Sequence, residues 1–110
     1  MTINAIVLEA LTKIRNTGPV RPQSGICYNV LLITDSNIGA GTPFQRVVDL
    51  ASAWPKGVDG LWPVAGQDEA VGRYDYDAWD KNTEAGARRH ELLAWMIQQL
   101  EKELSNEQMA

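Results

Sequence analysis

The stretch from residue 83 to 104 constrains the fold more than any other part of this chain. It contains no proline and one glycine, and aliphatic residues recur in it on a helical period: Leu93, Ile97, Leu100 and Leu104. Residues at this spacing share one face of an α-helix, so the pattern predicts a long helix that forms one wall of a core. Leu92, Trp95 and Met96 widen the apolar face, which favours packing against more than one neighbour.

Three further helices are predicted before this one, at residues 3–16, 25–34 and 43–54. The first has an apolar face and ends before Pro19, which cannot continue a helix. The last of the three begins at Thr42-Pro43, a good N-cap followed by proline in the first turn. It ends near Pro55, because a residue that precedes proline disfavours the α conformation.

Residues 26–33 are compatible with two structures. Their β-branched content allows a buried strand, whereas Ile26, Val30 and Ile33 fall on one helical face. Ser24 can act as an N-cap, and no partner strand is evident elsewhere, so we favour a helix over 25–34. The predicted fold is mainly α: a small single-domain bundle of about four helices, for which 110 residues provide a sufficient core.

A long segment, 55–82, separates the third helix from the fourth. It is rich in glycine and shows little periodicity, yet it contains several aromatic residues: Trp62, Tyr74, Tyr76 and Trp79. A disordered linker would lack these side chains, so we predict an ordered, aromatic-rich loop wrapped on the helices. The tail, 105–110, is expected to fray.

Composition excludes several classes of protein. A net charge of −4 disfavours non-specific binding to nucleic acid, which needs a surplus of Lys and Arg. Cys27, the only cysteine, suits a reducing cytosol. Glu9 interrupts the apolar residues near the N-terminus, so no signal peptide is predicted, and no apolar run is long enough to span a membrane. We therefore expect a cytoplasmic protein that does not contact membranes.

Metal and catalytic sites are weakly indicated. One His and one Cys fall short of a zinc site. Asp75, Asp77 and Asp80 could hold a hard cation, although a solvated acidic loop explains them more simply. Cys27 and His90 could form a thiolate–imidazole pair, but a cysteine is more often a small buried hydrophobe. We expect no metal, no cofactor and no catalytic residue, and an enzyme that uses Cys27 and His90 ranks third among the functional hypotheses.

Arginine and aromatic residues gather before and at the start of the last helix. Arg offers a planar fork to phosphate, and aromatic faces stack on bases. The residues predicted to bind a ligand are Trp62, Arg73, Tyr74, Trp79, Arg88, Arg89 and His90. The alternative is that the aromatic side chains pack the loop while the arginines pair with nearby aspartates.

The order of short motifs along the chain resembles that of a group of small uncharacterised proteins of bacteriophages and prophages. These motifs are Gly18-Pro19-Val20, Gly25-Ile26-Cys27-x-Asn29-Val30, Trp54-Pro55, Gly57-x-Asp59-Gly60-x-Trp62-Pro63-Val64, Trp79 and Arg89-x-Glu91-Leu92-Leu93-x-Trp95. The chain departs from the group at residues 58–62, where a Ser-Gly-Asp turn and an aromatic residue would be expected. The resemblance implies a phage or prophage context and no particular chemistry. Small phage proteins without catalytic signatures often act by binding.

The resulting hypothesis is a non-enzymatic protein that counters host antiviral defence by sequestering a nucleotide-derived signalling molecule. The alternative is a protein–protein inhibitor that blocks a host defence protein through an acidic surface bearing Trp side chains. A homo-oligomer with a pocket across subunits would be compatible with either hypothesis.

Overall fold

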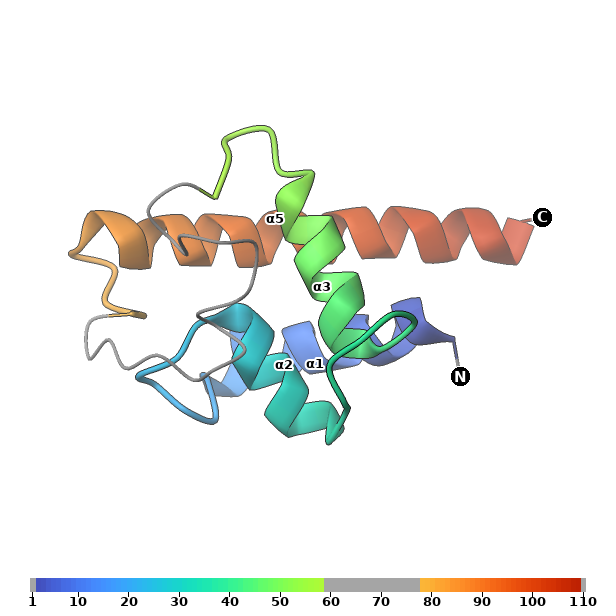
Figure 1. The fold of residues 1–110 in the computed structure, drawn as a ribbon. Helices are drawn as coiled ribbons and strands as arrows, with labels where there is room; N and C mark the ends of the chain where they lie inside the picture. The colour runs from blue at the N-terminus through green and yellow to red at the C-terminus, as the bar shows by residue number, and fades with distance from the viewer. Residues whose placement is uncertain (1, 59–77, 110) are drawn as a thin grey trace.

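In the computed structural model of this protein, residues 2–58 and 78–109 are described, and they form four helices without a strand (Figure 1). The helices are α1 (Ile3–Thr17), α2 (Ile26–Thr34), α3 (Pro43–Ser52) and α5 (Glu84–Met109). The predicted mainly α bundle is thereby confirmed, and residues 26–33 are helical. Most of the predicted aromatic-rich loop, 59–77, lies outside the described residues.

The first helix is the one against which the others pack. α1 contacts α2, α3 and α5, and α3 also contacts α2 and α5. Figure 1 shows α1 and α5 side by side in opposite directions, so that the start of α1 lies near the end of α5. At one end of the helix pair the start of α1 therefore lies next to the end of α5, and at the other end the end of α1 lies next to the start of α5.

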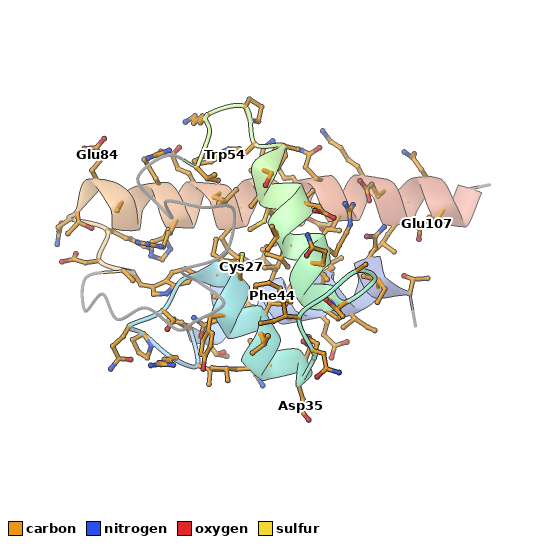
Figure 2. The ribbon with its side chains drawn as sticks, viewed as in Figure 1. Cys27, Asp35, Phe44, Trp54, Glu84 and Glu107 are labelled. Atoms are coloured by element: carbon orange, nitrogen blue, oxygen red, sulfur yellow. The ribbon has the colours of Figure 1, made fainter. Side chains whose placement is uncertain are left out.

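The buried core lies between these helices and is almost entirely aliphatic (Figure 2). Cys27 lies in it with no exposed surface, and the same core includes the aromatic rings of Phe44 on α3 and of Trp54 just after it. Most of the α5 face that the sequence predicts to be apolar is buried, while its members Trp95 and Leu104 are partly buried. The aliphatic and Met residues that α1, α2, α3 and α5 contribute include Val7, Leu11, Ile14, Ile26, Val30, Val47, Leu92, Leu93, Met96, Ile97 and Leu100.

Threonine hydroxyls cap two helix starts, and the cap at Thr42 is predicted from the sequence. Thr2 Oγ1 accepts a hydrogen bond from the backbone N–H of Ala5 at 3.2 Å, and Thr42 Oγ1 accepts one from Gln45 at the same distance. The predicted N-cap role of Ser24 is wrong, because Gly25 occupies the N-cap of α2. The end of α3 also differs: the helix stops at Ser52, two residues before the predicted end.

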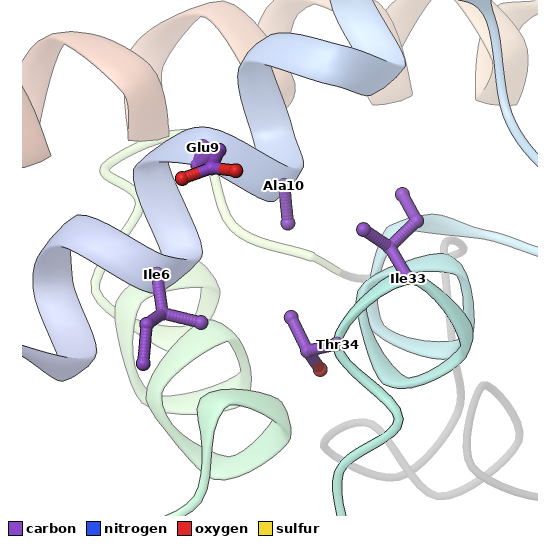
Figure 3. Close-up of a pocket in the computed structure, with 5 residues that line it drawn as sticks. All are labelled: Ile6, Glu9, Ala10, Ile33 and Thr34. Atoms are coloured by element: carbon purple, nitrogen blue, oxygen red, sulfur yellow. The ribbon is translucent and has the colours of Figure 1, made fainter. Parts of the chain in front are cut away.

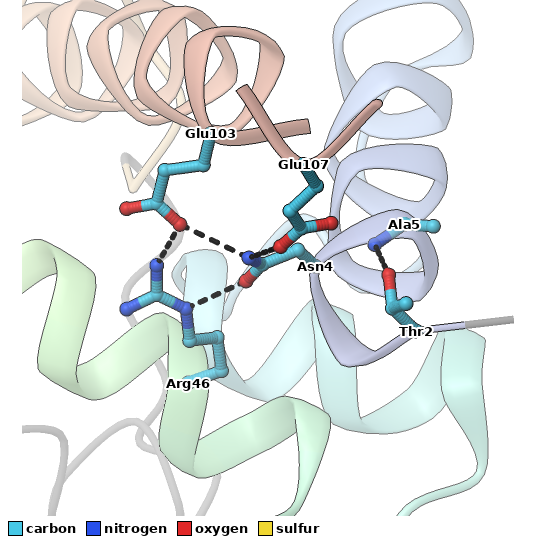
Figure 4. Close-up of polar contacts among 6 residues, drawn as sticks. All are labelled: Thr2, Asn4, Ala5, Arg46, Glu103 and Glu107. Atoms are coloured by element: carbon cyan, nitrogen blue, oxygen red, sulfur yellow. Dashed lines mark hydrogen bonds and ion pairs between the residues drawn. The ribbon is translucent and has the colours of Figure 1, made fainter. Parts of the chain in front are cut away.

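The last helix is longer than the sequence predicts. α5 continues to Met109, so most of the tail that we expected to fray is helical. The Asn4 side chain donates hydrogen bonds to Glu103 Oε2 at 3.0 Å and to Glu107 Oε1 at 3.1 Å (Figure 4). Arg46 joins the network, with Nη2 2.6 Å from Glu103 Oε2 and Nε 2.9 Å from Asn4 Oδ1. These contacts attach the last turns of α5 to α1 and α3, which a local sequence pattern does not reveal.

A buried amide fixes the turn between α1 and α2. Asn29 is fully buried, and its Oδ1 accepts a hydrogen bond from the backbone N–H of Arg21 at 2.8 Å. Its Nδ2 donates to the backbone carbonyls of Arg21, Ser24 and Gly25 at 3.2, 3.1 and 2.7 Å. Since a buried amide must find partners for its polar atoms, this side chain and the turn determine each other's position.

Among the described helices, none is long and apolar enough to cross a membrane. α5 is the longest, with 26 residues, and charged side chains recur along its length. Its apolar residues pack against α1 instead.

Replacement of Asn29 by aspartate tests the importance of this amide. Asn29→Asp keeps the shape of the side chain but replaces a donor with a carboxylate that faces three carbonyl oxygens. We expect a loss of at least about 3 kcal/mol in the free energy of unfolding, measured by urea denaturation. Asn37→Asp, the same change at an exposed position, is the matched control. Equal stability of the two variants would contradict the role assigned to Asn29.

Candidate functional site

The structure describes four of the residues predicted to bind a ligand. Trp79, Arg88, Arg89 and His90 lie at the start of α5 and in the segment just before it. The other three, Trp62, Arg73 and Tyr74, lie outside the described residues. Asp75 and Asp77, two of the three carboxylates considered for a cation, also lie outside them. Within the described part, no group of three or more His, Cys, Asp or Glu side chains is placed to hold a metal ion.

A tight turn begins α5. Asp80 Oδ1 accepts a hydrogen bond from the backbone N–H of Asn82 at 2.9 Å, which is the geometry of an Asx turn. Thr83 Oγ1 accepts one from the backbone N–H of Gly86 at 3.0 Å, the usual bond of an N-cap residue. Thr83 Oγ1 also donates to the Asp80 carbonyl at 2.8 Å. The turn is thus held by side-chain oxygens at both of its ends.

Gly86 allows this turn to lie directly against the helix. A Cβ atom at this position would overlap with the carbonyl oxygen of Asp80 and would lie 2.8 Å from Thr83 Oγ1. Only glycine therefore fits the position without a shift of the turn. The close approach sets the path of the backbone at residues 78–80 along the first turns of α5.

Two adjacent residues of α5 bind two adjacent backbone carbonyls in that segment. The guanidinium of Arg89, a side chain only 5% exposed, donates from Nη1 to the Ala78 carbonyl at 3.0 Å. His90 Nε2 lies 3.0 Å from the Trp79 carbonyl. Since a carbonyl oxygen can only accept, His90 Nε2 carries a hydrogen in this contact, which leaves Nδ1 as the second polar atom of the ring.

The Trp79 side chain connects this segment to the turn between α1 and α2. Its indole Nε1 donates to the Ser24 carbonyl at 2.6 Å, and the same carbonyl accepts from Asn29. The Trp79 ring also meets the His90 ring edge to face, with centroids 5.3 Å apart and planes inclined by 79°. Trp79 and His90 are thus held as a rigid, partly buried pair.

Arg88 makes a similar contact with the backbone just before residues 59–77 in the sequence. Its Nη2 donates to the Gly57 carbonyl at 2.5 Å, and its guanidinium carbon lies 5.8 Å from the centre of the Trp54 ring. Lys56 and Glu91 add an exposed ion pair at 2.6 Å. Successive residues of one turn of α5 therefore hold the backbone just before and just after residues 59–77. Any contact of Arg88 or Arg89 with a ligand stays a prediction.

A small pocket of about 150 Å³ lies beside His90, between the end of α1 and the start of α5. Three of its lining residues are basic: Arg15, Lys81 and His90. The others are apolar: Ile14, Leu93 and Ala94. Sequence reasoning did not select Arg15 or Lys81. No local signal could have done so, because they meet only through the antiparallel packing of α1 against α5.

Two other pockets have a different character. One, of about 160 Å³, is lined by Ile6, Glu9, Ala10, Ile33 and Thr34 of α1 and α2 (Figure 3). A wider one, of about 260 Å³, lies where α1 meets the start of α3 and is lined by Ile3, Gly41, Thr42, Gln45, Arg46 and Asp49. The ionisable group of the pocket between α1 and α2 is the carboxylate of Glu9. In the wider pocket, the guanidinium of Arg46 is already bonded to Asn4 and Glu103. Neither gathers several basic groups.

The two residues of the enzyme hypothesis have different surroundings. Cys27 has no exposed surface and belongs to the apolar core, whereas His90 is partly exposed and lines a pocket. A thiolate at Cys27 would not meet a substrate from solvent. The surroundings of this side chain are those of a small buried hydrophobe.

Comparisons with known proteins leave the resemblance to phage and prophage proteins as a prediction. Neither the protein-family models, nor the curated proteins, nor the solved structures give a match to this chain. Its function is therefore inferred from its own residues.

We expect Gly86→Ala to destabilise the protein, although alanine is the better helix former by about 1 kcal/mol. The added methyl group overlaps with the Asp80 carbonyl, and crowding of this kind costs roughly 1–3 kcal/mol. Thermal unfolding followed by circular dichroism measures the change. Ser105→Ala, on the exposed face of α5, is the control and should not lower the melting temperature. A Gly86→Ala variant with a raised melting temperature would refute the close approach.

Trp79→Phe removes the indole donor and keeps an aromatic ring. Loss of the hydrogen bond to the Ser24 carbonyl should lower the free energy of unfolding by roughly 1 kcal/mol. Trp95→Phe is the matched control, because Trp95 is also partly buried but makes no hydrogen bond through its indole to the described residues. Chemical denaturation of both variants provides the comparison, and an equal loss in the two would argue against the Trp79–Ser24 bond.

Proposed function

We propose that this protein is a non-enzymatic binding protein that sequesters a small nucleotide-derived signalling molecule and thereby counters host antiviral defence. One observation carries the proposal: the rigid Trp79–His90 pair stands beside a pocket with three basic side chains. An aromatic face next to a cationic pocket suits a ligand that has both a base and a phosphate.

The fixed position of the Trp79 ring favours binding. The ring is held by its bond to the Ser24 carbonyl and by its contact with His90, so a ligand that stacks on it need not order it. Side chains that are ordered before binding reduce the entropic cost of association. Stacking of a base on an aromatic ring contributes about 1–3 kcal/mol.

Charge favours a small ligand over a long polyanion. The chain has a net charge of −4, which repels nucleic acid from most of its surface. Against that background, a basic pocket attracts a small anion to one place. The remaining residues predicted to bind the ligand, Trp62, Arg73 and Tyr74, belong to the proposal as predictions from sequence alone.

The second candidate is an inhibitor that binds a host defence protein. Exposed aliphatic side chains favour it: Leu32 on α2 and Ile38 in the following loop are 40% and 58% exposed. Exposed apolar side chains on an acidic surface can serve as contacts for a protein partner. The described Trp side chains do not add to this surface, since Trp54 is buried and Trp79 and Trp95 are partly buried.

Isothermal titration of the protein with AMP, ADP-ribose and cyclic dinucleotides tests the first candidate. We expect saturable binding of at least one of them, and retention of that binding in Trp79→Phe. Trp79→Ala should weaken the affinity by about tenfold or more, because it removes the stacking face. Trp95→Ala is the control and should bind as the wild type does.

Absence of heat with every one of these ligands would count against the proposal. Affinity capture from host lysate then separates the candidates. A protein partner bound in a one-to-one ratio would support the inhibitor, whereas a nucleotide released from the protein on denaturation would support sequestration.

A further inference from the structure

We infer that the pocket between the end of α1 and the start of α5 binds a terminal phosphate monoester through Arg15 and Lys81, with His90 as part of its wall. The inference names the ligand class and the phosphate subsite for the proposed function, and it rests on that function for the nucleotide part of the ligand. Trp79 and the predicted binding residues outside the described part keep the roles that the proposed function gives them.

Three separate segments bring the basic groups together. Arg15 comes from the last turn of α1, Lys81 from the turn before α5, and His90 from the second turn of α5. Buried Ile14 and Leu93 form part of the wall. Arg15 and Lys81 are exposed and His90 is partly buried, so water and salt screen their attraction for an anion, and the site depends on the number of cations that the packing gathers.

The donors in this pocket are available to a ligand. Arg15 Nε donates to Asn16 Oδ1 at 3.3 Å, and the two terminal nitrogens of its guanidinium have no partner among the described residues. The Lys81 ammonium likewise has no partner within the described part of the chain. The His90 ring hydrogen is on Nε2, where it is donated to the Trp79 carbonyl, so Arg15 and Lys81 are the donors of this pocket.

Nearby carboxylates do not occupy the pocket. The residues described as lining it include no Asp or Glu. Asp80, next to Lys81 in sequence, accepts from the backbone N–H of Asn82, and Glu91, next to His90, pairs with Lys56. Among the described residues, no ion pair joins Arg15, Lys81 or His90 to these carboxylates.

The number of donors favours a phosphate monoester over a diester. A monoester presents three terminal oxygens and a charge close to −2, which matches an arginine fork and an ammonium. A diester has one charge and only two terminal oxygens, so it would leave part of this set without a partner.

The position of the pocket is consistent with a nucleotide whose base stacks on the Trp79 ring. His90 touches both the pocket and the Trp79 ring. A nucleotide with its terminal phosphate in the pocket could therefore place its base towards that ring. Cyclic nucleotides, whose phosphates are all diesters, lack the group that this pocket selects.

Titration with three probes at matched ionic strength tests the inference: AMP, 3′,5′-cyclic AMP and ribose 5-phosphate. We expect AMP to bind about tenfold or more tightly than cyclic AMP. Arg15→Gln and Lys81→Gln should each weaken AMP binding by about tenfold, while Lys81→Arg should retain it. Lys13→Gln removes one positive charge from the same helix outside the pocket and should change the affinity by less than about twofold. Circular dichroism confirms that each variant is folded.

Each result bears on one proposal or the other. AMP binding that survives both Arg15→Gln and Lys81→Gln would overturn the phosphate subsite and leave the proposed function intact. An equal loss in Lys13→Gln would also overturn it, as would equal affinity for AMP and cyclic AMP. Ribose 5-phosphate that binds as tightly as AMP would support the subsite but remove the nucleotide from the proposed function. No binding of any of the three probes would overturn the phosphate subsite, and the proposed function would be overturned as well only if ADP-ribose and the cyclic dinucleotides also failed to bind.

Discussion

The hydrogen bonds of one buried amide support much of the arrangement around the candidate site. Asn29 holds the turn between α1 and α2 by contacts with Arg21, Ser24 and Gly25. The Ser24 carbonyl, positioned in this way, accepts the indole hydrogen of Trp79. A side chain in the core thus fixes a ring at the surface, and the cost of burying the amide is offset because all of its polar groups are paired.

The start of α5 combines two roles that are usually separate. Arg88, Arg89 and His90 bind backbone carbonyls on both sides of residues 59–77, which is a structural role. One of them, His90, also lines the basic pocket. A ring that is anchored through one nitrogen can offer the other to a ligand without losing its orientation, which is how metal and catalytic sites commonly use histidine. The structural contacts therefore help to prepare the pocket.

The helices could be predicted from sequence because apolar residues on a 3.6-residue period require a buried face, and because Thr42-Pro43 marks a helix start. The extent of α5 could not, since its last turns are held by Asn4, almost a whole chain length away. The candidate site was predicted only in part. Trp79 and His90 do meet, but Arg88 and Arg89 also donate to backbone carbonyls, for which sequence carries no signal. Arg15 and Lys81 become neighbours only when α1 and α5 pack together.

The packing of α1 against α5 also has a consequence for synthesis on the ribosome. The Asn4–Glu103 contact joins residues 99 positions apart, so one face of α1 remains uncovered until α5 has emerged. Meanwhile α1, α2 and α3 contact one another and can form a partial core as they are made. Contacts of such long range slow folding and leave apolar surface exposed. During that interval the unfinished protein would depend on chaperones, or on the speed of translation, to avoid aggregation.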